Sequence, residues 1–253
     1  MPVKDAMRPF DEYDLRARIF PALVVSLPVV ACVYTVIPAA RSMTGFGLGG
    51  LLEASALYFI ARIARDKGAK AQKRLFKEWG GLPSTLFLRH RDGTIDPLTK
   101  ARYKVCLAKL TGLEFPSESA EEALPDVADS TYASSVKALL EQRRDKKFRL
   151  IFLENCNYGF MRNLFGLRAI GLLLAVSTLS ADAYRFYLKG SAAPLLISLV
   201  VSGVMLFLLM FGVSKHAVRR SADAYAHALL RSCEPGPPRP ARSRRKPAEI
   251  AES

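Results

Sequence analysis

Two short polar stretches carry side chains that could bind an anion. In the first, ENCNYGFMRN, Glu154, Tyr158 and Arg162 recur at intervals of four residues, so a helix would present them on one face, with Asn155 beside them. Arginine, tyrosine and asparagine all donate hydrogen bonds, which is what a phosphate or carboxylate requires. The alternative is structural, namely a charge-paired helix at the point where the chain enters a membrane.

The second stretch, FKEWGGLPSTLFLRHRD, gathers Arg89, His90, Arg91 and Asp92 behind a glycine pair and the only tryptophan, Trp79. Its basic groups also suit an anion. The alternative is a tight turn that packs against the preceding helix. Both stretches are therefore candidate ligand-binding sites, and a small anionic molecule is a candidate partner.

Patterns typical of catalysis fail when their surroundings are compared with what the chemistry needs. His90, Arg91 and Asp92 spell the catalytic-loop tripeptide of protein kinases, but no glycine-rich loop precedes them and Pro97 occupies the position of the metal-binding asparagine. GFGLGG lacks the flanking strand of a dinucleotide site. The three histidines have no zinc spacing, and no two of the four cysteines form a CxxC pair. We expect no catalytic residue, no metal and no cofactor, and hence not an enzyme.

One carboxylate stands in an apolar run. Glu53 lies within TGFGLGGLLEASALYFI, residues 44–60. An unpaired charge at the centre of a bilayer costs about 2.5 to 3.5 kcal/mol, so such a group usually faces a bundle interior or a water-filled path. Glu53 is therefore a candidate pore residue, and the alternative is a protonated Glu53 hydrogen-bonded to Tyr34.

The elements that would position these groups are membrane-spanning helices. Residues 20–40 and 193–213 each contain no charge over 21 positions, long enough to cross about 30 Å of hydrocarbon. Residues 44–63 and 169–187 are weaker candidates. A cleaved signal peptide is the alternative for the first segment, but its charged leader is long for one. We predict four spans in two hairpins, packed through small residues: Gly45, Gly49, Gly171, Ser198 and Ser202.

The distribution of basic residues predicts the orientation. The chain has a net charge of +14, and only Arg41, Arg185 and Lys189 of its 37 lysines and arginines lie at the two hairpin tips. Basic residues favour the cytoplasmic side. We therefore expect a multi-pass protein of the inner (plasma) membrane with both termini cytoplasmic, and with the lipid bilayer as a partner. Nucleic acid is not expected, because no base-stacking or base-reading motif accompanies the charge.

The fold class that follows is a mainly all-α integral membrane protein with a mostly helical cytoplasmic domain between the second and third spans. Asp96, Pro97 and Gly112 mark one helix of that domain, and Gly80 and Gly81 end the helix before it. Residues 82–96 are predicted to form a short strand or extended turn and 113–130 an acidic loop. A further helix is predicted from about Asp126 or Ser130 to Arg144. The boundaries are a leader (1–19), a hairpin (20–63), the cytoplasmic domain (64–163), a second hairpin (164–213), an amphipathic helix (214–233) and a disordered basic tail (234–253).

The elements WGGxP[ST], LRHRD and ENxxYGFxRN resemble those of a family of uncharacterised bacterial four-span membrane proteins. The resemblance covers roughly residues 64–168 and the pattern of spans, and it implies no activity. More loosely, the two hairpins and cytoplasmic termini look like the topology of large-pore channels such as connexins, but the long cysteine-bearing outer loops used for docking are absent.

Three functions are compatible with this sequence. The first is a homo-oligomeric channel or membrane-permeabilising effector gated by its cytoplasmic domain, for which bacterial defence is one interpretation; several subunits would be needed, because four spans alone enclose no wide path. The second is a membrane-anchored sensor or scaffold that binds a partner or an anionic ligand. An enzyme ranks last, because no nucleophile and base can be paired.

Overall fold

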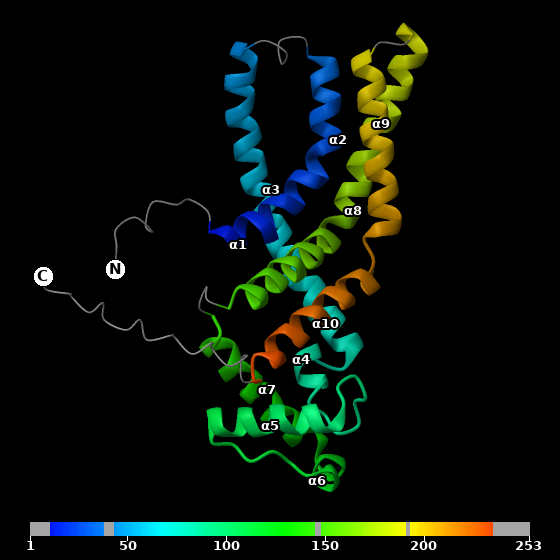
Figure 1. The fold of residues 1–253 in the computed structure, drawn as a ribbon. Coiled ribbons are helices and arrows are strands. Elements are labelled where there is room, and N and C mark those ends of the chain that lie inside the picture. Colours follow the sequence, from blue (N-terminus) through cyan, green and yellow to red (C-terminus); the bar gives the residue numbers. More distant parts are fainter. Residues whose placement is uncertain (1–10, 38–42, 145–147, 191–192, 235–253) are drawn as a thin grey trace, which may run out of the picture.

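Every regular element is a helix in the part of the chain that the computed structural model describes, residues 11–37, 43–144, 148–190 and 193–234 (Figure 1). The side chains of residues 43–54, 57 and 189 lie outside that part. The predicted all-helical fold is therefore confirmed for the described residues.

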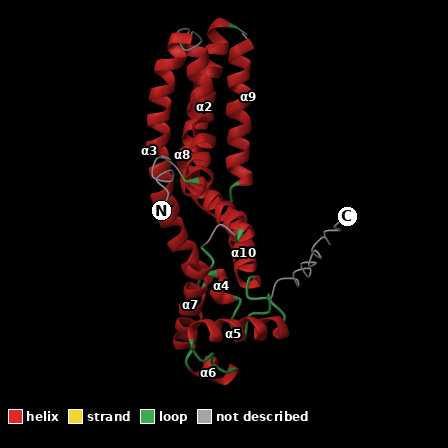
Figure 2. Ribbon diagram, turned by 60° about the vertical axis from the view of Figure 1, so that its left-hand side comes forward, coloured by secondary structure: helices red, strands yellow, loops and turns green. Residues whose placement is uncertain are grey.

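The first part of the fold is a group of long helices that lie side by side (Figure 2). It consists of α2 (Phe20–Val36), α9 (Ala193–Phe207) and the upper parts of α3 (Met43–Trp79) and α8 (Arg149–Lys189). The short α1 (Glu12–Asp14) leads into α2 through a π-helical turn, and a second π-helical turn, Leu208–Gly212, extends α9. α8 lies at the centre, because it contacts α2, α3 and α9.

Among the described residues, three helical segments are long and apolar enough to cross a membrane: Glu12–Val36, Arg149–Leu188 and Ala193–Gly212. The sequence predicted four. The missing segment, residues 44–63, forms the upper part of α3 and is not among the three. It contains Glu53 and Arg62, and many of its side chains lie outside the described residues.

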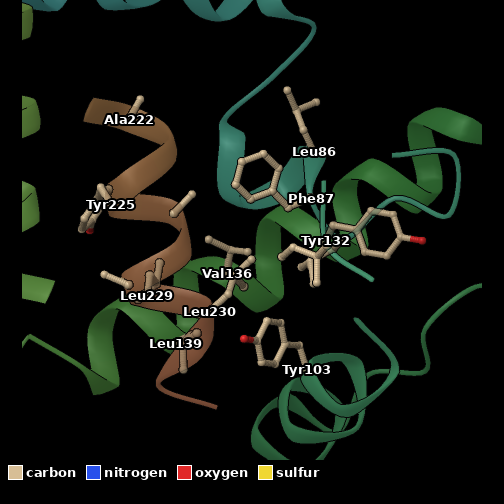
Figure 3. Packing of buried hydrophobic residues seen from close by; sticks show 14 of the residues in the cluster. Leu86, Phe87, Tyr103, Tyr132, Val136, Leu139, Ala222, Tyr225, Leu229 and Leu230 are labelled. Carbon is tan, nitrogen blue, oxygen red and sulfur yellow. The ribbon is translucent and has the colours of Figure 1, made fainter. Parts of the chain in front are cut away.

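The second part is a helical domain below the spans. It contains α4 (Pro83–Leu86), α5 (Pro97–Thr111), α6 (Glu118–Ala123), α7 (Pro125–Gln142) and α10 (Lys215–Arg231), together with the lower parts of α3 and α8. In the core of this domain, Phe87 at the C-terminal end of α4 packs in one buried cluster with Tyr132 of α7 and Leu229 of α10 (Figure 3). Leu75 of α3 and Tyr158 of α8 are buried in the same core. The two longest helices thus belong to both parts of the molecule.

Local sequence signals explain where several of these helices begin and end. Asp96 accepts a hydrogen bond from the Thr99 N–H at 2.9 Å and caps α5, and Gly112 takes the left-handed conformation (φ 70°) that ends it. Gly80, also at positive φ (78°), follows the last residue of α3. These predicted boundaries are confirmed. α10 lies where the sequence predicted an amphipathic helix, and its apolar face packs into the domain core.

Two predictions for the helical domain are wrong. The stretch predicted as extended contains α4, where Pro83 occupies the first helical position and residues 83–88 are all buried. Because this segment is buried on every side, its sequence lacks the separate polar and apolar faces by which a surface helix is recognised. The acidic segment predicted as a loop contains α6, because the Ser117 hydroxyl accepts from the Ala120 N–H at 3.2 Å and caps it.

Candidate ligand site and intramembrane polar cluster

Arg89 is held by a structural ion pair. Its Nε and Nη2 atoms lie 2.7 and 2.5 Å from the two carboxylate oxygens of Asp129 on α7, and Nη2 also donates to the Gly80 carbonyl oxygen at 2.9 Å. The bidentate pair ties the turn after α3 to α7. The predicted ligand residue Arg89 is therefore engaged within the fold.

His90, the next residue, joins a buried polar network. Its backbone N–H donates to Glu121 of α6 at 2.9 Å, and the same carboxylate oxygen accepts from the Tyr132 hydroxyl at 2.6 Å. Lys104 of α5 completes the network, with its Nζ 2.7 Å from His90 Nε2 and 3.4 Å from the Tyr132 hydroxyl. The acidic segment therefore supplies the carboxylate that holds His90, a role that its polar composition concealed.

The neighbours of His90 Nε2 require opposite protonation states. The Pro116 carbonyl oxygen, 3.0 Å away, can only accept, so it requires an N–H. The Lys104 ammonium can only donate, so it requires the bare nitrogen. Both contacts cannot be satisfied while Lys104 is charged and close. An anion that drew the ammonium away would remove the conflict.

Burial also disfavours the charged form of Lys104. It lowers the pKa of Lys104 to about 8, although Glu121 and Glu118 act in the opposite direction. For Tyr132, burial first and then the hydrogen bond to Glu121 raise the pKa. Burial alone would raise the pKa of Glu121 too, but the hydrogen bonds from Tyr132 and His90 together bring it below its usual value.

A cavity of about 280 Å³ opens beside this network, between the turn at residues 90–97 and α5. Its lining includes His90, Arg91, Lys100 and Lys104. Two carboxylates, Asp92 and Asp96, also line the cavity. Asp92 accepts a hydrogen bond from the Thr94 N–H at 2.9 Å, and Asp96 accepts one from the Thr99 N–H at 2.9 Å as the cap of α5.

The Lys100 ammonium, buried, donates to the carbonyls of Arg89 and Asp92 and holds the turn. Arg91 is exposed and has no ion-pair partner in the described part of the chain. Arg91 and Lys104 are thus the cations of this cavity that are available to a ligand.

The other predicted cluster lies elsewhere, along α8. Arg162 donates to Gln72 of α3 at 2.5 Å and to Asn163 at 3.2 Å, and it does not line the cavity beside His90. Tyr158 is buried and stacks on Tyr225 of α10, with ring centroids 6.3 Å apart. Glu154 accepts from Asn157 at 3.4 Å, and Asn155 is partly buried. The structure therefore does not join this cluster to Arg89, His90, Arg91 and Asp92.

Asn163 has a role that sequence reasoning did not identify. Its Nδ2 donates to the Ala17 carbonyl oxygen at 2.6 Å, in the turn before α2. That carbonyl is four residues before Pro21, which has no N–H to offer it. Asn163, fully buried, thus donates to a carbonyl that cannot accept the usual helical hydrogen bond from the residue four positions later. A polar residue on a helix opposite an in-helix proline is the signal by which it could have been found.

A second polar cluster is buried among the spans. Asp182 of α8 is fully buried and accepts hydrogen bonds from Ser198 of α9 and, at 3.4 Å, from Arg185. Arg185 also donates to the hydroxyl and carbonyl oxygens of Thr35, at 2.6 and 3.1 Å, at the end of α2. Cys32 lies 3.6 Å from Asp182. The cluster therefore joins three spans, and its charged groups are satisfied within one chain.

The remaining predicted residues are placed as follows. Gly171 packs closely, because a Cβ atom there would lie 2.8 Å from Leu209 and 3.3 Å from Val25. Ser202 is buried and lies 3.1 Å from the Thr178 hydroxyl. Tyr34 is about half exposed, at 51%. The side chain of Glu53 and the surroundings of Gly45 and Gly49 lie outside the described residues.

Comparison of the chain with models of protein families, with curated proteins and with solved structures finds no match. Among the described residues, no group of three or more His, Cys, Asp and Glu side chains is placed to hold a metal ion.

Proposed function

We propose that the chain is a membrane-anchored sensor whose cytoplasmic helical domain binds a small anionic ligand in the cavity beside His90. The observation that carries the proposal is the pair of cations, Arg91 and Lys104, that line one cavity, whose two carboxylates accept hydrogen bonds from nearby backbone N–H groups. Binding would also resolve the conflict at His90 Nε2, so the anion would stabilise one arrangement of the turn over another.

The helices α3 and α8 are the route by which occupancy would reach the membrane. Each runs without interruption from the spans into the domain core, where Leu75 and Tyr158 are buried. Arg89, adjacent to His90, is tied to Gly80 at the end of α3. A shift of the turn at Arg89 and His90 would therefore move the end of α3, and α3 would transmit that movement as a rigid helix.

The arrangement in the inner membrane has four spans, with the upper part of α3 as the fourth, and both termini cytoplasmic. The support is the alignment of this part of α3 beside α2 (Figure 2) and the concentration of basic residues away from the hairpin tips. A reporter that requires the cytoplasm should be active when fused after residue 120 or at the carboxyl terminus, and one that requires the opposite side near Ser191. The reverse result at residue 120 would overturn the orientation.

Binding is tested with inorganic pyrophosphate as the probe, by thermal unfolding of the detergent-solubilised protein. Wild type should gain thermal stability, and Arg91→Gln and Lys104→Met should lose that gain. Lys109→Gln removes an exposed charge from α5 outside the cavity and should keep it. Equal gains in all four proteins would contradict the site.

The homo-oligomeric channel is the second candidate, and Glu53 is its test. The cluster of Asp182 and Arg185 among the spans is satisfied within one chain and offers no support for a water-filled path. If subunits surround a path lined by Glu53, Glu53→Gln should lower the preference for cations over anions in liposome flux. Wild-type protein that conducts no ion at measured density, with and without pyrophosphate, would remove the channel.

A further inference from the structure

A separate basic cavity of about 370 Å³ lies between α3 and α8. Its lining includes the cationic residues Lys67, Lys70 and Arg74 of α3 and Arg168 of α8, together with Phe165. It shares no lining residue with the cavity beside His90.

Arg168 fixes the depth of this cavity relative to the spans. Its Nε and Nη2 atoms donate to the carbonyl oxygens of Leu209 and Met210, each at 3.0 Å. Those carbonyls belong to the turn that ends the segment Ala193–Gly212, one of the three able to cross a membrane. The cavity thus begins at the level where the apolar segment ends, and it extends along α3 away from it.

The protein neutralises the charges of this cavity only in part. Lys67 and Lys70 are exposed and have no ion-pair partner in the described ranges. Arg74 approaches Glu78 only at 4.0 Å, and its guanidinium lies 6.0 Å from the centre of the Phe165 ring. No acidic side chain lines the cavity. Arg168 keeps its Nη1 group available after it donates to the two carbonyls.

The close approach of α3 and α8 forms the floor of the basic cavity. Gly166 is part of the lining, and a Cβ atom there would lie 2.7 Å from the carbonyl carbon of Lys67. Only glycine permits α8 to lie this close to α3, so the cations of both helices surround one space.

We propose that this cavity binds the phosphate group of an anionic phospholipid. Basic pockets between spanning helices at the cytoplasmic surface suit such headgroups, and each lysine or arginine near the surface contributes about 1 kcal/mol to attraction of anionic lipid. The depth set by Arg168 favours a lipid over a soluble phosphate, since the acyl chains can stay in the hydrocarbon while the phosphate meets the cations. Lipid binding in this cavity depends on the proposed placement in the membrane, and it does not depend on the ligand site beside His90.

The test measures retention of phosphatidylglycerol by the intact protein in mass spectrometry from phosphatidylcholine-containing detergent micelles. Lys67→Gln with Lys70→Gln should weaken retention roughly thirtyfold, the product of two lysine contributions. Lys67→Arg with Lys70→Arg, which keeps both charges, should retain the lipid. Both lysines are exposed, so each variant should unfold at the wild-type temperature in phosphatidylcholine alone.

The matched control is Arg65→Gln with Lys73→Gln. It removes two charges from exposed positions of the same helix that do not line the cavity, and it should retain the lipid. Equal loss in the two double glutamine variants would show general surface attraction and overturn the proposal. Displacement of phosphatidylglycerol by excess glycerol phosphate would assign the site to a soluble anion and would also overturn it. A failure of the pyrophosphate test at Arg91 and Lys104 leaves this result unaffected, because the residues are different.

Discussion

Gly68 of α3 and Gly166 of α8 lie backbone against backbone. A Cβ atom on Gly166 would lie 2.6 Å from the Gly68 nitrogen, and one on Gly68 would collide with the Asn163 side chain. The sequence gives Gly166 the appearance of a weak point in a long helix, whereas in the fold it permits the contact between the two helices that link the spans to the helical domain.

Gly166→Ala should therefore destabilise the protein by about 1 to 3 kcal/mol, the usual cost of overpacking a tight contact. Gly203→Ala is the control, because no atom lies within 4 Å of a Cβ atom there and alanine favours a helix. We expect the control to match or exceed wild type in thermal unfolding in detergent. If both substitutions left stability unchanged, the contact between α3 and α8 would not be as close as the structure has it.

Ser198→Ala should destabilise the spans, because Asp182 is fully buried and loses a hydrogen bond. Leaving a buried acceptor unsatisfied costs about 1 to 3 kcal/mol. Ser202→Ala is the control on the same helix, and it should cost less, since Thr178, the partner of Ser202, also donates to the Leu174 carbonyl. Unfolding in a denaturing detergent series measures both. A larger loss from Ser202→Ala would contradict the importance of the Asp182 cluster.

Arg89 and Arg91 are two residues apart in the sequence, on either side of His90, but the structure separates their roles. Arg89→Lys keeps the charge but cannot maintain the bidentate contact with Asp129, so it should lower stability by about 1 to 3 kcal/mol. Arg91→Gln, at an exposed position, should change stability by less than about 0.5 kcal/mol. The two variants are compared by urea unfolding without any anion. Equal destabilisation would mean that Arg91 also has a structural partner.

The sequence was sufficient for features that depend on local geometry. Asp96, Pro97 and Gly112 define α5 because a cap, a first-turn proline and a left-handed glycine act within a few residues. Composition likewise located Ala193–Gly212 as a segment that is long and apolar enough to cross a membrane. α4 was missed because its burial comes from α7 and α10, which are distant in sequence.

The polar sites required the tertiary structure. The sequence offered Arg162 and Arg89 as anion-binding candidates in two separate stretches, yet Arg162 pairs with Gln72, whereas Arg89 pairs with Asp129. Lys104 was read only as part of an ordinary helix. Lys104 contacts His90 and Tyr132, which both bind Glu121. These three residues come from three other segments, and spacing along the chain does not reveal that kind of convergence.

Arg162→Ala provides a direct test of that separation. The guanidinium of Arg162 does not line the cavity beside His90, so the variant should keep the gain in thermal stability that pyrophosphate gives wild type, although its starting stability falls. Loss of the gain would place Arg162 in the site with Arg91 after all and would contradict the arrangement of the two clusters. The comparison uses the shift within each protein, so the lower starting point does not interfere.

The last prediction concerns the pH dependence of Lys104. Its pKa of about 8 in the folded protein lies below the ordinary value of 10.5, because burial disfavours the ammonium. Between pH 8 and pH 10.5, Lys104 binds more protons in the unfolded chain than in the folded protein. The contribution of Lys104 to the free energy of folding therefore becomes more favourable as the pH rises through this range. Below pH 8 the cost of burying the charge is present in full. Lys104→Met removes the titrating group and keeps an unbranched side chain.

The difference in unfolding temperature, Lys104→Met minus wild type, should therefore fall as pH rises from 7 to 10, while the other groups that face Lys104, namely His90, Lys100, Glu118, Glu121 and Tyr132, are common to both proteins. A bound anion favours the charged form, so sulfate binding at pH 8 should take up protons in wild type. Calorimetry in two buffers with different ionisation enthalpies detects that uptake, and sulfate itself does not titrate there. A temperature difference that is constant with pH, together with no proton uptake in a protein that binds sulfate, would show that Lys104 is not the titrating cation of the site.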